Sequence, residues 1–244
     1  MTSPTEKNIN FKCGAVNTSA LSKKVVDEKA DIGFAFDGDG DRLIIVDEKG
    51  NEIDGDKIIA LFAKHLIKFN KRKLKYPIVS TVMSNIGLEN YILNKFKVNL
   101  KRSSVGDINV IKEMQKYNSL LGGEQSGHII LSDYSKTGDG ILAALKVTEI
   151  ISKLKKSTST IFNLYENSPQ IKINIPYKKI SKNTINFIKN INKKKLKDKN
   201  MRLLIRLSGT EPLIRILVEG NNLNEVNTIA KNIAKNIRTK LGKQ

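Results

Sequence analysis

Residues 31–46 read DIGFAFDGDGDRLIIV, in which two apolar runs flank a loop of alternating aspartates and glycines. Short apolar runs that end at Gly and Asp are typical of buried strands. The loop at 37–42 is therefore expected to join two strands. Residues 18–29, just before the first run, have the apolar spacing of a helix.

Downstream of this pair, helix and strand patterns alternate. A turn at 48–51 precedes a helix whose apolar residues fall at 58, 62, 66 and 69. We expect further strands near 76–81 and 97–102 and one ending at 121, and further helices near 84–96, 107–117 and 138–154. Such alternation predicts an α/β fold, in which helices cover a sheet.

The composition changes at 155–160, and we place a domain boundary after residue 156. Beyond it, isoleucines at 171, 173 and 175 alternate with polar residues. A Lys/Asn-rich helix, strands at 201–207 and 212–219, and an amphipathic helix follow. This pattern predicts a C-terminal α+β domain, so the full expectation is three domains, at 1–50, 51–156 and 157–244.

Cys13 is the only cysteine, and His65 and His128 are the only histidines. A disulfide framework, a structural zinc cluster and most nucleophile–histidine schemes are therefore excluded, and a bound metal must be held by oxygen. No apolar run approaches the length of a membrane span, and the N-terminus lacks the apolar segment of a signal peptide. The sequence predicts a cytoplasmic protein with no membrane partner.

The formal net charge of +19 raises nucleic acid as a partner, because clustered Lys and Arg neutralise phosphates. Most of the 43 basic residues are lysines, spread over helices and loops without interleaved aromatic residues. We therefore expect a solvated Lys-rich surface and no nucleic-acid partner. Three of the arginines, Arg42, Arg206 and Arg215, fall instead in the motifs that carry chemistry.

The loop at 37–42 places Asp37, Asp39 and Asp41 at alternate positions, with glycines that allow the carboxylates to turn toward one point. Like charges this close need a cation, and Mg²⁺ prefers all-oxygen ligands. A calcium loop would need glycine where Arg42 stands, and an acidic turn that binds nothing is the simplest alternative. The three aspartates are the candidate Mg²⁺ ligands.

Residues 206–215 read RLSGTEPLIR and span the turn between two expected strands. Two guanidinium groups, two hydroxyls and the N–H groups of a turn can converge there on one phosphate. A plain Ser-Gly hairpin turn is the alternative.

Residues 122–128 read GGEQSGH and offer a carboxylate, a hydroxyl and an imidazole from one short loop. A few placed polar groups of this kind suit the hydroxyls of a sugar. The alternatives are an ordinary loop and, for His128, a packed and hydrogen-bonded histidine.

In this order and spacing, the three loops resemble the metal-, sugar- and phosphate-binding loops of the α-D-phosphohexomutase superfamily. Segments at 8–10, 13–15, 81–85 and 136–140, together with Gln125, resemble its phosphoglucosamine mutase branch. The likeness covers nearly the whole chain. It implies phosphohexomutase-type α/β domains followed by a C-terminal α+β domain: the end of domain 2 at 1–50, domain 3 at 51–156 and domain 4 at 157–244.

The resemblance also implies roles for the loop residues. The aspartates at 37, 39 and 41 would hold Mg²⁺ as cofactor, and Arg42 and His128 would be catalytic residues near the reacting phosphoryl group. Substrate-binding residues would be Glu124 and Ser126 for the sugar, and Arg206, Ser208, Gly209, Thr210 and Arg215 for the phosphate. The implied reaction interconverts glucosamine 6-phosphate and glucosamine 1-phosphate, with a hexosamine phosphate as substrate.

Two departures from the family pattern affect these expectations. The family segment similar to 105–107 usually continues with a basic residue, whereas Ile108 and Asn109 follow here. Family members also carry a phosphorylated serine in a Ser-Gly context in an N-terminal domain, yet both Ser-Gly pairs of this chain lie in the ligand loops. We therefore expect an N-terminally truncated chain that is weak or inactive alone, with a phosphoserine domain on a separate chain as candidate partner.

Two other functions stay open from the sequence. One is a phosphomannomutase or phosphoglucomutase activity, against which Gln125 in the sugar loop argues. The other is a non-catalytic fragment that binds sugar phosphates.

Overall fold

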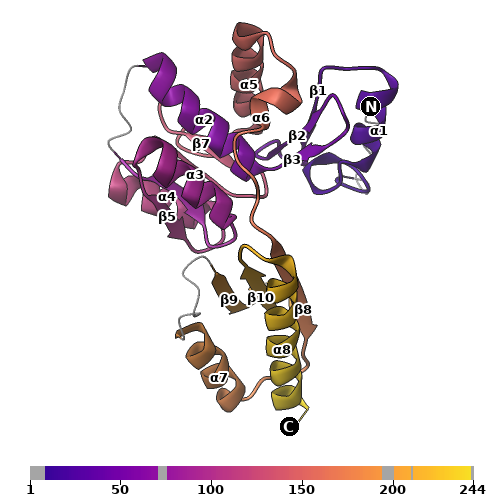
Figure 1. Ribbon diagram of the computed structural model, residues 1–244, viewed down its shortest axis with the longest axis vertical. Coiled ribbons are helices and arrows are strands. Elements are labelled where there is room, and N and C mark those ends of the chain that lie inside the picture. The colour runs from indigo at the N-terminus through magenta and orange to yellow at the C-terminus, as the bar shows by residue number, and fades with distance from the viewer. Residues whose placement is uncertain (1–8, 71–75, 194–200, 210, 243–244) are drawn as a thin grey trace. The chain divides into compact units, whose positions relative to one another are not determined.

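This computed structural model describes residues 9–70, 76–193, 201–209 and 211–242. The chain divides into two compact units, Met1–Glu166 and Asn167–Gln244. Most of their elements are labelled in Figure 1. Unit 1 contains η1 (Gly14–Val16), α1 (Ser19–Asp27), β1 (Ile32–Phe36), β2 (Leu43–Asp47), β3 (Glu52–Ile53), α2 (Gly55–Asn70), β4 (Ile78–Thr81), α3 (Ile86–Phe96), β5 (Leu100–Ser103), α4 (Asp107–Tyr117), β6 (Leu121–Gly123), β7 (Ile129–Leu131), α5 (Gly140–Leu154) and α6 (Thr158–Phe162). Unit 2 contains β8 (Gln170–Pro176), α7 (Lys182–Lys193), β9 (Arg202–Leu207), β10 (Leu213–Glu219) and α8 (Leu223–Leu241).

The first sheet of unit 1 is antiparallel, with the strand order β1-β2-β3. Phe36 of β1 pairs with Leu43 of β2, so the aspartate loop closes the hairpin between them, as the sequence predicted. Every residue of β2 is buried, and both α1 and α5 contact this strand pair. Because helices cover this strand pair, β2 has an uninterrupted apolar run at 43–46. A strand with one face in solvent would instead alternate apolar and polar residues.

The second sheet of unit 1 has the strand order β5-β4-β6-β7. The central strand β4 is fully buried and parallel to β5 and β6, whereas β7 is antiparallel to β6. The helices α3 and α4 make the crossovers that parallel strands require. Leu43 and Ile45 of the hairpin share one hydrophobic core with Ile78 and Leu121 of this sheet. The segments before and after residue 50 therefore pack as one body.

Unit 2 has an antiparallel sheet in the order β8-β10-β9. The helix α8 buries four residues at spacings of three and four, the period of an amphipathic helix. They are Val226, Ala230, Ala234 and Ile237, and they form a core with residues of all three strands. The predicted C-terminal α+β domain is thereby confirmed.

The structure differs from the sequence expectation at the start of the C-terminal domain and at the end of β6. The units divide after Glu166 instead of after residue 156, because Ile161 and Phe162 of α6 are buried in the core of unit 1. The strand β6 also continues through Gly122 and Gly123, past its expected end at 121, because both residues pair with neighbouring strands. None of the described helices combines the length and apolar character needed to cross a membrane.

Candidate functional site

The metal loop, residues 37–41, brings three carboxylates together. One carboxylate oxygen from each of Asp37, Asp39 and Asp41 lies within 4.8 Å of the other two. The loop turns through Gly40, which has a φ of +73° and donates its N–H to Asp37 O at 3.1 Å. Glycine adopts this backbone conformation without the steric cost that a side chain would bring. Three convergent oxygen donors fit a hard divalent cation such as Mg²⁺.

The cationic groups that the structure describes neutralise the charge of the metal loop only in part. Arg42 donates its backbone N–H to Asp37 Oδ1 at 3.1 Å, and its Nε lies 3.4 Å from Asp37 Oδ2 and 3.9 Å from Asp41 Oδ1. Burial raises the pKa of Asp41, and the hydrogen bond and charge of Asp37 raise it further. One guanidinium beside three carboxylates leaves net negative charge, which a divalent cation would offset. The predicted residue Arg42 thus lies beside the metal loop.

His128 lies behind the metal loop. Its Nδ1 is 3.0 Å from Asp41 Oδ2, the residue is 3% exposed, and its backbone forms an isolated β-bridge with Arg42. Gly138 packs against the imidazole so closely that a Cβ there would overlap the ring. A buried imidazole in this position orients the carboxylate of Asp41, a predicted metal ligand. His128 is thus packed and hydrogen-bonded, as one of the alternatives from the sequence predicted. Its catalytic role stays a prediction.

The sugar loop, residues 124–127, is fixed to the metal hairpin by backbone contacts. Leu43 N donates to Gly127 O at 2.9 Å. Gly127 has a φ of +97°, and a Cβ there would overlap the backbone of Leu43. On its other side, Gly55 at the start of α2 donates its N–H to Gln125 O at 3.0 Å. The structure therefore brings the predicted metal ligands and the predicted sugar-binding residues together in unit 1.

The side chains of the sugar loop differ in exposure and in contacts. Glu124 is 8% exposed, and its Oε1 accepts the N–H of Gly106 at 3.0 Å, just before α4. Gln125 Nε2 donates to Asp54 Oδ2 at 3.1 Å. Ser126 is exposed to solvent. The Ser126 hydroxyl can thus meet a ligand directly, whereas the Glu124 carboxylate is oriented by the start of a helix.

A third segment, residues 138–140, contacts the metal loop and His128, a role that the sequence did not predict. Gly140 N donates to Gly40 O at 3.0 Å, and a Cβ at Gly140 would lie 2.5 Å from Arg42 O. Asp139 caps α5 by accepting the N–H of Leu142 at 2.8 Å. Two glycines around an aspartate at the start of a helix are a sequence signal for close backbone approach, and this signal could have predicted the supporting role of the segment.

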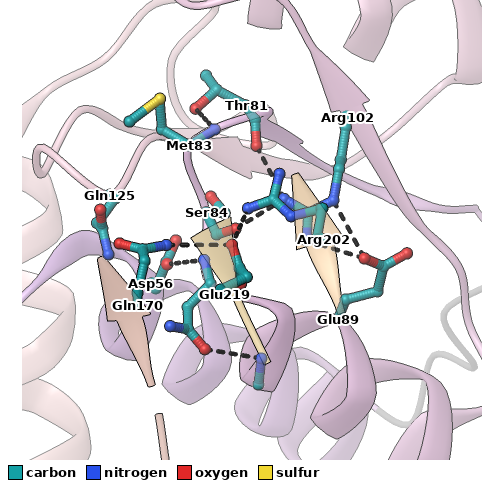
Figure 2. A network of polar contacts seen from close by, with 12 residues as sticks. Asp56, Thr81, Met83, Ser84, Glu89, Arg102, Gln125, Gln170, Arg202 and Glu219 are labelled. Atoms are coloured by element: carbon teal, nitrogen blue, oxygen red, sulfur yellow. Dashed lines mark hydrogen bonds and ion pairs between the residues drawn. The ribbon is translucent and has the colours of Figure 1, made fainter. Parts of the chain in front are cut away.

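A polar network surrounds the segment 81–85 of unit 1 (Figure 2). Arg102 Nη1 donates to the backbone oxygens of Thr81 at 3.3 Å and Ser84 at 2.7 Å. Its Nε and Nη2 bind Glu89 Oε2 at 3.1 and 2.8 Å. A guanidinium that makes four such contacts holds the end of β4 and the start of α3 in a fixed conformation.

Asp56 lies in the first turn of α2, next to the glycine that supports the sugar loop. It is fully buried, and its Oδ2 accepts the N–H of Asn85 at 2.7 Å. Burial, followed by the charge of Asp54, raises the pKa of Asp56 from 3.8 to about 7. The carboxylate therefore changes its ionisation near neutral pH inside the framework that carries the site.

The phosphate loop connects β9 to β10 in unit 2. Arg206 and Arg215 are directly paired across these two strands, and Ser208 N donates to Leu213 O at 2.8 Å. Burial and the neighbouring Arg215 lower the pKa of Arg206. A Cβ at Gly209 would meet no atom within 4 Å, so the turn is open to solvent. Two adjacent guanidinium groups beside an open turn suit an anion.

The predicted phosphate-binding residues are only partly described by the structure. It brings the two arginines together and places Ser208 and Gly209 in the adjoining turn, whereas Thr210 lies outside the described residues. Glu211, to which the sequence analysis gave no role, accepts a hydrogen bond from Arg215 Nη2 at 2.5 Å.

Three domain families match the chain in succession. They are the phosphoglucomutase/phosphomannomutase alpha/beta/alpha domain II over residues 4–50, domain III over 54–168, and the C-terminal domain over 165–236. Together these matches account for almost the whole chain.

Curated relatives match at substantial identity. A phosphoglucosamine mutase from Fusobacterium nucleatum is 46% identical over 98% of this chain and 53% of the relative. One from Sulfurovum sp. is 46% identical over 91% of this chain and 49% of the relative. The chain thus spans about half the length of the curated relatives that it matches.

Solved structures share the fold at lower identity. A phosphoglucomutase/phosphomannomutase family protein from Burkholderia thailandensis has a TM-score of 0.77 at 22% identity, over 93% of this chain and 50% of the other. An Aspergillus fumigatus N-acetylphosphoglucosamine mutase, solved with GlcNAc-6P and magnesium, has a TM-score of 0.73 at 19% identity, over 95% of this chain and 54% of the other. These likenesses confirm the predicted fold class.

Proposed function

Because the chain belongs to the phosphoglucomutase/phosphomannomutase family, we propose that it serves the interconversion of glucosamine 6-phosphate and glucosamine 1-phosphate by Mg²⁺-dependent phosphoryl transfer. The observation that carries the proposal is the convergence of three carboxylates within 4.8 Å in a loop fixed to the sugar loop. The hexosamine phosphate is chosen as substrate because the relatives at 46% identity are phosphoglucosamine mutases.

In this proposal Asp37, Asp39 and Asp41 hold Mg²⁺. The bound ion offsets negative charge on a transferring phosphoryl group. Arg42, beside the aspartates, supplies a further positive charge, and His128 keeps Asp41 in its orientation. The side chains of the protein thus position the ligands and shape the electrostatic field of the loop.

The ligand loop of each unit has its own role in this proposal. Glu124 and Ser126 of unit 1 bind sugar hydroxyls. In unit 2 the phosphate is bound by Arg206, Ser208, Gly209, Thr210 and Arg215. Binding energy gained at the non-reacting phosphate is then available for orientation of the reacting group.

The phosphoryl carrier in this proposal is a phosphoserine that lies outside residues 1–244. The serines of both Ser-Gly pairs, Ser126 and Ser208, lie in the loops assigned to ligand binding. A covalent phosphoryl intermediate on either of them would conflict with that assignment, so intact-mass analysis after incubation with glucosamine 1,6-bisphosphate checks it.

Isothermal titration with Mg²⁺ tests the metal site. Asp39 is the exposed member of the three aspartates, so Asp39→Asn removes a ligand with little effect on the fold. We expect this change to weaken Mg²⁺ binding by about tenfold or more, because affinity follows the number of charged ligands. Asp27→Asn, which makes the same charge change on the exposed end of α1, is the matched control. Equal Mg²⁺ affinity in wild type and Asp39→Asn would refute the assignment.

A further inference from the structure

The phosphate loop contains one acidic side chain among its cationic groups. Glu211 Oε2 lies 2.5 Å from Arg215 Nη2, and the two side chains are 54% and 35% exposed. A carboxylate accepts from a guanidinium with much the same geometry as a phosphate does. Glu211 therefore binds to a group that the proposed function assigns to the substrate phosphate.

The surroundings explain why an internal anion is favourable here. Arg206 and Arg215 face each other across the β9–β10 ladder, and like charges placed directly opposite destabilise a sheet. The Nε atoms of both arginines are buried and have no hydrogen-bond partner among the residues that the structure describes. Glu211 offsets part of this charge by accepting one hydrogen bond from Arg215 Nη2. A phosphate carries more charge and more acceptor oxygens, so it can offset the charge of both guanidinium groups.

We propose that Glu211 is a built-in competing anion: it pairs with Arg215 when the phosphate site is empty and is displaced when a phosphate binds. The inference rests on the proposed function, because it presupposes that Arg215 binds phosphate. Its consequence is a lower affinity for phosphate than the two arginines alone would give, which favours release of the product. The opposite role, in which Glu211 holds Arg215 ready for phosphate, predicts the opposite effect of its removal.

Titration with inorganic phosphate distinguishes these roles. Glu211→Gln removes the charge and keeps the size of the side chain. We expect the variant to bind phosphate about two- to fivefold more tightly than wild type, the range that the loss of one exposed ion pair allows. The gain should shrink as salt is added, because exposed charges are screened.

Two further variants complete the experiment. Glu225→Gln makes the same charge change in unit 2, but beyond the opposite end of β10 at the start of α8, and it should bind phosphate like wild type. Arg215→Met should lose most of the phosphate affinity. If wild type does not bind phosphate, the proposed phosphate site and this inference both fail. If wild type binds but Glu211→Gln binds equally or more weakly, or if Glu225→Gln gains as much, only the inference fails.

Discussion

Replacement of Asp56 by asparagine should stabilise the protein, and increasingly so as the pH rises. Asp56 is fully buried, and its pKa is raised from 3.8 to about 7, chiefly by burial and next by the charge of Asp54. In the unfolded chain the carboxyl loses its proton near its ordinary pKa. Between these two values the folded state holds a proton that the unfolded state has released, so the stability of the folded state falls as the pH rises through this interval.

The size of the effect follows from the two pKa values. Ionising the buried carboxyl costs at most about 4 kcal/mol once the pH exceeds the folded-state value. The asparagine side chain would carry no charge, and its Oδ1 can still accept the N–H of Asn85, which Asp56 binds at 2.7 Å. The difference in free energy of unfolding between Asp56→Asn and wild type should therefore grow, in favour of the variant, by about 3 kcal/mol from pH 5 to pH 8.

Urea unfolding of both proteins at pH 5, 6, 7 and 8, followed by circular dichroism, measures this difference. Asp27 is an exposed aspartate on α1, and Asp27→Asn serves as the control. Its difference in free energy of unfolding from wild type should change little with pH. The reasoning would be refuted if Asp56→Asn destabilised the protein equally at every pH. That result would mean that hydrogen bonds of the ionised carboxylate outweigh the cost of its burial.

Two further changes test how the site is supported. Gly127→Ala should destabilise unit 1 by about 2–4 kcal/mol in thermal unfolding, because it combines a positive φ with overlap against Leu43. Gly40→Ala, where φ is also positive but the space is open, should cost only about 1 kcal/mol; equal losses would contradict the packing argument. His128→Ala should weaken Mg²⁺ binding about tenfold, whereas His128→Asn should keep part of it because an amide N–H can still reach Asp41; unchanged binding in both would exclude a positioning role.

The order of the elements could be predicted from the sequence because its signals are local. The apolar runs around the loop at 37–42 and the alternating isoleucines of β8 mark strands without reference to the rest of the chain. The extension of β6 through Gly122 and Gly123 could not be predicted in this way. Glycine has a low propensity for strands, and the pairing of these two residues with β4 and β7 overrides that low propensity.

The composition of the site was easier to predict than its contacts. The three aspartates converge because their positions and glycines are adjacent in sequence. The contact of His128 with Asp41 and the fixing of Gly127 to Leu43 depend on segments far apart in the chain. The same holds for the domain boundary, which the packing of Ile161 and Phe162 moves to Glu166.

Calorimetric titration with glucosamine 6-phosphate in the presence of Mg²⁺ tests the central claim most directly. We predict binding at one site per chain, tighter than that of mannose 6-phosphate and largely lost in Arg215→Met. Absence of binding, or equal affinity in wild type and Arg215→Met, would contradict the assignment of these loops to a hexosamine phosphate.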